Sequence, residues 1–144
     1  DLSHNPTMIF GMFAWAGDAT APGGLYRLRV TEQPIILPTE LHAQKGGLQL
    51  VFSEPIDPQS VTEDRIAIKT WSLKRSKRYG SDHLNEKQQS IRSIRLSADG
   101  KRIDIDLPKL KPTWCMEIQY EFRTLAGEKA EGVIHNTIHA LDGQ

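Results

Sequence analysis

Histidine and carboxylate side chains are the residues of this chain best suited to hold a metal ion. His135 and His139 are four residues apart. On a strand such residues share a face but lie about 13 Å from each other, too far to share a metal. His83 and Glu86 form a second pair, in a segment without periodicity that could fold toward either histidine. Two hydrogen-bonded strand histidines are the simpler interpretation. A small metal site built from His83, Glu86 and one of His135 or His139 stays open as an alternative.

The sequence contains no motif for covalent haem attachment or for nucleophilic catalysis. Cys115 is the single cysteine, so no internal disulfide can form, and c-type haem, which needs Cys-x-x-Cys-His, cannot attach. A blue-copper site needs histidines close to the cysteine, and the next one is His135. Neither Gly-x-Ser-x-Gly nor His-Glu-x-x-His occurs. We therefore expect no catalytic residue and no cofactor.

Basic and aromatic side chains gather around residue 75. Trp71 and Tyr79 flank the run Lys-Arg-Ser-Lys-Arg at 74–78, a combination that suits single-stranded nucleic acid or an acidic polysaccharide. Lys+Arg and Asp+Glu both number 18, so the formal net charge is zero. Nucleic-acid binders usually carry a basic excess, and we expect no nucleic-acid partner.

The elements that position these residues are predicted to be strands, because hydrophobic side chains alternate along most of the chain. About seven short strands with frequent turn signals, and no long amphipathic helix, are typical of an immunoglobulin-like sandwich. Two further runs, 7–13 and 25–30, predict a hairpin with a long loop at 14–24, whereas 74–89 is predicted to be a loop. The fold class is therefore all-β, an immunoglobulin/fibronectin-like antiparallel sandwich with an additional N-terminal hairpin.

The expected organisation is a hairpin and linker at 1–37, followed by the sandwich at 38–144. Pro34 and Pro38 bracket the linker. No apolar run approaches the roughly 18 residues of a membrane span, and the first residues lack the features of a signal peptide. We expect no membrane insertion, and a chain cut from a longer protein.

Two segments resemble bacterial Ig-like domains of the S-layer type. Residues 50–61, Leu-Val-Phe-Ser-Glu-Pro-Ile-Asp-Pro-Gln-Ser-Val, are similar to the second-strand signature of these domains. Residues 97–112, with Ser-Ala-Asp-Gly-Lys and then Leu-Lys-Pro, are similar to the later half. The resemblance covers about 38–141 and implies the sandwich, while such modules serve as spacers and binders alike.

The N-terminal part resembles the closing blade of sugar-dehydrogenase-like β-propellers, through residues 10–18 and 22–29. In large exported bacterial proteins this blade precedes an Ig-like domain and a c-type cytochrome domain. Three stretches look like that Ig-like domain: 69–75 with 79–81, then 113–117, and then 134–139. The resemblance implies an extracytoplasmic (periplasmic or secreted) redox parent, whose neighbouring domains are the expected partners.

Strand alternation divides the predicted third, sixth and seventh strands, at 65–73, 114–122 and 132–141, into two faces. In an immunoglobulin topology these strands share a sheet. Their core face is predicted to hold Ile66, Ile68, Trp114, Met116, Ile118, Ile134 and Ile138. The loop at 74–89 is expected to fold over the opposite face. The candidate binding surface comprises Lys69, Trp71, Tyr79, His83, Glu86, Glu117, His135 and His139.

The sequence predicts a non-catalytic Ig-like accessory module of a larger exported redox protein. It would position neighbouring domains, or bind a partner, through the sheet face of Trp71 and His135. An exposed Trp on a sheet either stacks on a ligand or is covered by protein, and the N-terminal hairpin is expected on the sheet that carries Trp71. The alternatives are a carbohydrate-binding module with Trp71 and Tyr79 as stacking platforms, and the metal site described above.

Overall fold

The computed structural model of the chain describes residues 7–10, 25–28, 35–77 and 79–142. They belong to two compact units, Asp1–Pro34 and Ile35–Gln144. In the first unit β1 (Thr7–Phe10) and β2 (Leu25–Leu28) pair antiparallel, as expected. The loop predicted at 14–24, and most of the segment that resembles a propeller blade, lie outside the described residues.

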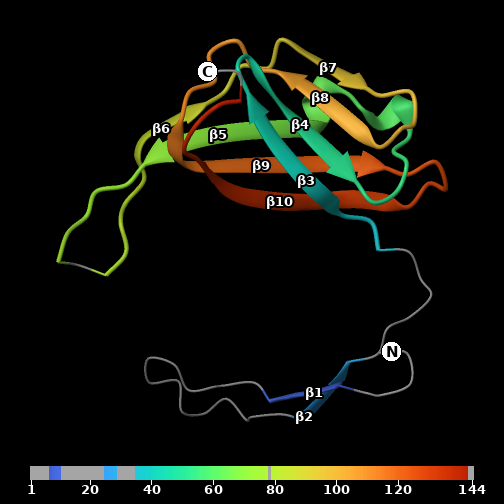
Figure 1. The fold of residues 1–144 in the computed structure, drawn as a ribbon, viewed down its shortest axis with the longest axis horizontal. Coiled ribbons are helices and arrows are strands. Elements are labelled where there is room, and N and C mark those ends of the chain that lie inside the picture. The colour runs from blue at the N-terminus through green and yellow to red at the C-terminus, as the bar shows by residue number, and fades with distance from the viewer. Residues whose placement is uncertain (1–6, 11–24, 29–34, 78, 143–144) are drawn as a thin grey trace. The chain divides into compact units, whose positions relative to one another are not determined.

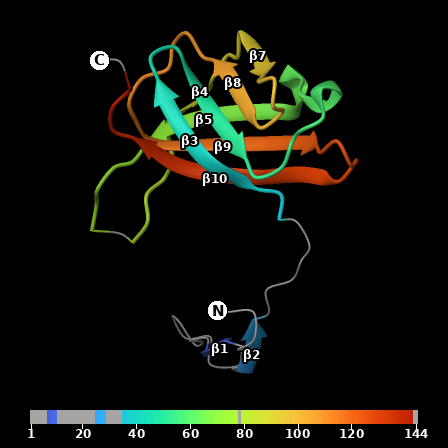
Figure 2. The ribbon, with the colours of Figure 1, turned by 45° about the vertical axis from the view of Figure 1, so that its right-hand side comes forward.

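The second unit consists of two four-stranded antiparallel sheets (Figures 1 and 2). One sheet has the order β3-β4-β8-β7, formed by Pro38–Gln44, Gly47–Phe52, Arg102–Asp106 and Ser93–Leu96. The other has the order β10-β9-β5-β6, formed by Lys129–Ile138, Thr113–Arg123, Ile66–Ser72 and Leu84–Gln88. Apart from β6, this is the division of strands in immunoglobulin domains. The predicted all-β sandwich is therefore confirmed.

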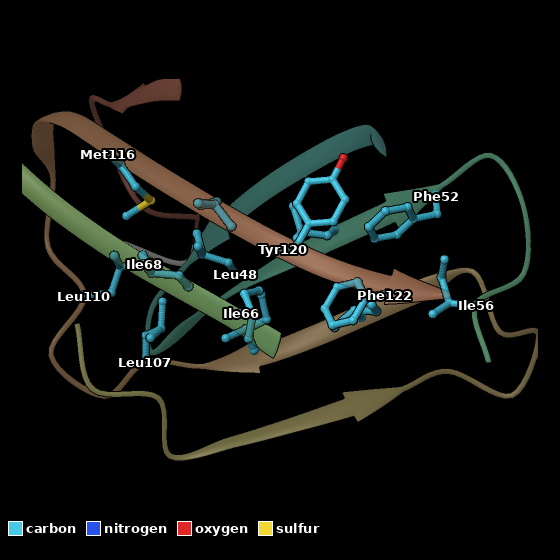
Figure 3. Packing of buried hydrophobic residues seen from close by; sticks show 14 of the residues in the cluster. Leu48, Phe52, Ile56, Ile66, Ile68, Leu107, Leu110, Met116, Tyr120 and Phe122 are labelled. Carbon is cyan, nitrogen blue, oxygen red and sulfur yellow. The ribbon is translucent and has the colours of Figure 1, made fainter. Parts of the chain in front are cut away.

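The core lies between the sheets, where every second residue of the central strands is buried (Figure 3). Phe52 from β4 meets Tyr120 and Phe122 from β9 edge-on, with ring centroids 5.4 and 6.1 Å away. Edge-to-face contacts of this kind add to the hydrophobic gain from burial. The fully buried core residues include Leu48, Leu50, Ile56, Ile68, Ile103, Met116, Ile118 and Phe122.

Two short 3₁₀ turns, η2 (Pro58–Ser60) and η3 (Glu63–Arg65), connect β4 with β5 on the opposite sheet. Asp57 caps η2, since its side chain accepts a hydrogen bond from the Gln59 amide. The Ser60 hydroxyl in turn accepts from the backbone amide of Arg123 at the end of β9, at 3.0 Å. Helical structure in the described residues is limited to such turns, and none of it is long and apolar enough to cross a membrane.

The segment 74–89, predicted to be a loop, contains the strand β6. Lys69 of β5 pairs with Gln88, and Ser72 pairs with Leu84. All five residues of β6 are exposed, so no hydrophobic alternation marks the strand in the sequence. Residues before β6 project from the end of the sandwich (Figures 1 and 2).

Trp114 was predicted to face the core but is 66% exposed. Between the pairs Asn136–Met116 and Ile138–Thr113, β9 contains two residues and β10 contains one. This is a β-bulge, which shifts the alternation of the strand by one residue. The bulge accounts for the exposure of Trp114 next to the buried Met116.

Candidate functional site

The outward-facing residues of β5, β9 and β10 form one continuous surface, which we call the outer face. Strand register sets its rows, because residues that pair across strands lie side by side. Lys69 pairs with Glu117, which pairs with His135, and Trp71 pairs with Cys115. The outer face comprises Ala67, Lys69, Trp71, Cys115, Glu117, Gln119, Val133, His135 and Thr137.

Glu117 is the centre of the polar row. Its carboxylate lies 3.2 Å from the Lys69 Nζ and 3.9 Å from the His135 Nε2. The Gln119 amide donates a hydrogen bond to the same carboxylate at 2.8 Å. The Glu117 side chain is only 12% exposed, and a charge so far removed from water requires a close partner. Lys69 supplies that partner, so this part of the face is neutralised internally.

Trp71 is covered by protein, which is one of the two possibilities that its position on the outer face left open. It is 8% exposed, yet it is not a member of the core cluster. The His83 imidazole stacks on the indole, with ring centroids 4.2 Å apart and an interplanar angle of 19°. His135 meets the ring edge-on at 6.4 Å, and the Lys69 Nζ lies 5.7 Å from its centroid, within reach of a cation–π contact. His83, directly before β6, thus lies over the outer face, whereas the segment between it and β5 projects away.

A bulge in β6 brings His83 and Glu86 to this position. Between Thr70–Lys87 and Ser72–Leu84, β6 contains two residues and β5 contains only Trp71. Asn85, one of those two, has φ 55°, a left-handed conformation that asparagine tolerates better than most residues. The extra residue of such a bulge redirects neighbouring side chains.

Glu86 and His83 form a tight pair beside Trp71. The Glu86 carboxylate lies 2.6 Å from the His83 Nδ1. This hydrogen bond lowers the pKa of Glu86, and the positive charges of Lys69 and His83 lower it further. The positive charge of Lys69 therefore stabilises two carboxylates, Glu117 from β9 through an ion pair and Glu86 from β6 through its electrostatic effect.

The structure brings six of the eight predicted surface residues together and separates the other two. Tyr79 is 97% exposed, on the projecting segment between β5 and β6. His139 follows the end of β10 and lines a hollow next to Trp114. The six that gather around Trp71 are Lys69, Trp71, His83, Glu86, Glu117 and His135.

The proposed metal ligands do not form a metal site in the part of the chain described here. No three His, Cys, Asp or Glu side chains in it converge so that they could hold an ion. His83 and His135 instead pack against the Trp71 ring. The polar side chains around Trp71 are fixed in position and their charges are compensated by one another, which is compatible with contact to another polar surface.

Two surface hollows were not predicted from the sequence. One, of about 460 Å³, lies at the opposite end of the outer face, between Asp64, Arg65, Gln119, Glu121 and Glu131. The alternation of β9 and β10 could have located its glutamates but not the turn that supplies Asp64 and Arg65. The other, of about 220 Å³, is lined by Pro112, Thr113, Trp114, Thr137, Ile138 and His139. It was missed because the bulge that exposes Trp114 has no sequence signal.

Comparison with known proteins shows a likeness of fold. No protein-family model matches the sequence, and no curated protein matches it. Among solved structures, the chain is similar to domains 1–6 of the surface layer protein SbsC, with 12% identity, and to a crystal structure of the S-layer protein rSbsC, with 13% identity. The TM-score is 0.53 in both cases. Each match covers 72% of this chain but 14% of the other. The chain is thus a β-sandwich that resembles part of a much longer S-layer protein in its fold.

Proposed function

We propose that the chain is a non-catalytic accessory module of a larger exported protein, in which it positions neighbouring domains through the outer face. The row of Lys69, Glu117 and His135 is the observation that carries this proposal. The nearly buried Glu117 carboxylate is held by partners on both adjacent strands. The charged groups of the row are therefore fixed in position, and polar groups of a neighbouring domain can match them. Interfaces between domains of one chain are typically polar in this way.

The fold supports the same role. The chain spans 14% of the S-layer chain that it resembles, a protein described as having at least six domains. A sandwich of this size in a longer chain is a spacer in the simplest interpretation. The N-terminal resemblance to a closing propeller blade favours an exported redox protein as the parent.

Of the two alternatives, the carbohydrate-binding module would need Trp71 and Tyr79 as open stacking platforms, and the structure does not favour it. His83 covers the Trp71 ring, so no sugar can stack on its free side without displacing that imidazole. Tyr79 is fully accessible but lies on a separate segment. The outer face is therefore better suited to a protein neighbour than to a glycan.

The test compares two charge insertions in the full-length protein. Val133 on the outer face and Leu125 in the turn after β9 are both exposed hydrophobic residues, so neither change should prevent folding. Lysine cross-linking followed by mass spectrometry should join Lys69 to residues beyond 35–142 in the wild type. Val133→Glu should reduce these cross-links severalfold, and Leu125→Glu should leave them unchanged. Cross-links that arise only from remote lysines such as Lys45, or that survive Val133→Glu, would overturn the proposal.

A further inference from the structure

We propose that the hollow at Trp114 is a binding subsite for a neutral sugar, the terminal or single pyranose unit of a glycan. It lies at the end of β9, outside the row of Lys69, Glu117 and His135, so this inference goes beyond domain positioning. Two-thirds of the Trp114 surface is exposed. A ligand that stacks on the ring would remove this apolar surface from water, which is favourable.

The backbone around Trp114 is held in place. The Thr137 hydroxyl from β10 donates a hydrogen bond to the Trp114 carbonyl at 2.7 Å. The Thr113 hydroxyl donates to the Cys115 carbonyl at 3.1 Å. These bonds fix the bulge from both sides, and bulges often serve to aim a side chain at a functional site. The backbone that carries the indole is thus held in place and needs no ordering on binding.

The lining of the hollow matches the two kinds of surface on a pyranose. One face of the sugar ring carries C–H groups, which pack on an indole, and its rim carries hydroxyls. The rim would find the indole N–H as a donor, the His139 imidazole, and the oxygens of Thr113 and Thr137 as acceptors. Both threonine hydroxyls already donate their proton to a backbone carbonyl. Their oxygens can therefore accept hydrogen bonds from the sugar.

Size and charge narrow the ligand class. A hollow of about 220 Å³ is smaller than the roughly 300–1,000 Å³ of pockets that enclose drug-sized molecules, so it suits one ring. The six lining residues include no Asp, Glu, Lys or Arg. No charge is therefore present in the lining to pair with a uronate or a sulfate, and a neutral sugar is the favoured occupant. A single stacked ring should bind with a Kd of about 1 mM.

The experiment titrates the 144-residue protein with four neutral oligosaccharides, cellotriose, maltotriose, mannotriose and chitotriose, and with an alginate oligosaccharide as the charged counterpart. The indole N–H signal of Trp114 is followed by NMR and assigned with Trp114→Phe. At least one neutral trisaccharide should shift this signal saturably. Trp114→Ala should weaken that binding at least tenfold, whereas Trp114→Phe should keep most of it. Leu125→Ala, which removes another exposed side chain, serves as the matched control.

Trp114→Ala should fold normally because the side chain is exposed, and its unfolding temperature checks this. Three outcomes would overturn the proposal. The first is no saturable shift with any neutral trisaccharide. The second is a shift with alginate alone, which would point to surface lysines. The third is neutral binding that Trp114→Ala leaves intact. None of them bears on the outer-face cross-links, so the two proposals fail independently.

Discussion

At the scale of single residues, Glu117 holds the outer face together. Its carboxylate is nearly buried and depends on Lys69 and Gln119 for compensation. An ion pair of two exposed side chains contributes little to stability, whereas removing one partner of a shielded pair leaves a charge without compensation. The contribution of Glu117 should therefore stand out against that of ordinary surface pairs.

A double-mutant cycle measures this difference. Lys69→Met and Glu117→Gln, made singly and together, should give a coupling free energy of about 1 kcal/mol in urea unfolding at neutral pH. The exposed pair Lys129 and Glu131, with N–O distances of 3.3 and 3.5 Å, is the matched control and should give less than about 0.5 kcal/mol. Equal coupling in the two pairs would mean that Glu117 is no more than a surface charge.

The pair of His83 and Glu86 should respond to acid. The hydrogen bond from His83 lowers the pKa of Glu86 below its ordinary value of 4.5. A carboxyl group whose pKa is lower in the folded state stabilises that state above the unfolded pKa, and the effect disappears as the pH falls through the folded pKa. The contact of His83 with Trp71 should therefore loosen below pH 4.5, in a window set by Glu86.

The indole N–H signal of Trp71 reports this event in an NMR titration. The wild-type signal should move between pH 4.5 and the acid limit of the folded state. Glu86→Gln should abolish the transition, because an amide does not titrate. Glu40→Gln, which removes the carboxylate of the exposed pair with His42 on the other sheet, should leave it in place. A transition that persists in Glu86→Gln would assign the event to another carboxyl group.

At the scale of elements, two bulges in the sheet β10-β9-β5-β6 decide which side chains it presents. The bulge in β6 depends on the left-handed Asn85, with φ 55°. Glycine adopts this conformation freely, whereas a β-branched residue pays about 1–2 kcal/mol there. Asn85→Val should therefore lower the free energy of unfolding by about 1 kcal/mol and release His83 from the Trp71 ring.

Asn85→Gly is the matched control for this prediction, because it removes the same side chain and keeps the backbone conformation accessible. It should retain the wild-type Trp71 indole signal and change stability by less than about 0.5 kcal/mol. If both variants lost the Trp71 contact equally, the asparagine side chain rather than its backbone would hold the bulge.

Alternation of hydrophobic residues was sufficient to predict the two faces of β5, β9 and β10, because the pleat repeats every two residues wherever the ladder is regular. It failed at three places for physical reasons. Trp114 lies in a bulge that moves the alternation by one residue. β6 has no buried side to create a pattern. Trp71 occupies the outer face as predicted, but its burial depends on His83, a contact that no local pattern encodes.

At the scale of the whole molecule, the boundary of the sandwich is set by hydrogen bonds that precede its first strand. The predicted boundary fell at residue 38, where β3 begins. Upstream of it, the Ser53 hydroxyl donates to the Ile35 carbonyl at 2.5 Å and accepts from the Leu37 amide at 3.1 Å. The Ser53 amide also donates to the Leu37 carbonyl at 3.0 Å. Ile35–Leu37 therefore belongs to the sandwich.

These bonds lead to a prediction on truncated chains. A chain that starts at Ile35 should keep a cooperative transition, with an unfolding temperature within about 2 °C of the full chain. A chain that starts at Pro38 loses three hydrogen bonds near the surface, together about 1–2 kcal/mol. In a domain of this size such a loss lowers the unfolding temperature by about 5 °C.

Ser53→Ala in the longer chain should reproduce most of that drop, because it removes two of the three bonds. Circular dichroism on heating measures all three. A large loss of stability on removing 1–34 alone would instead make the first unit part of the cooperative fold.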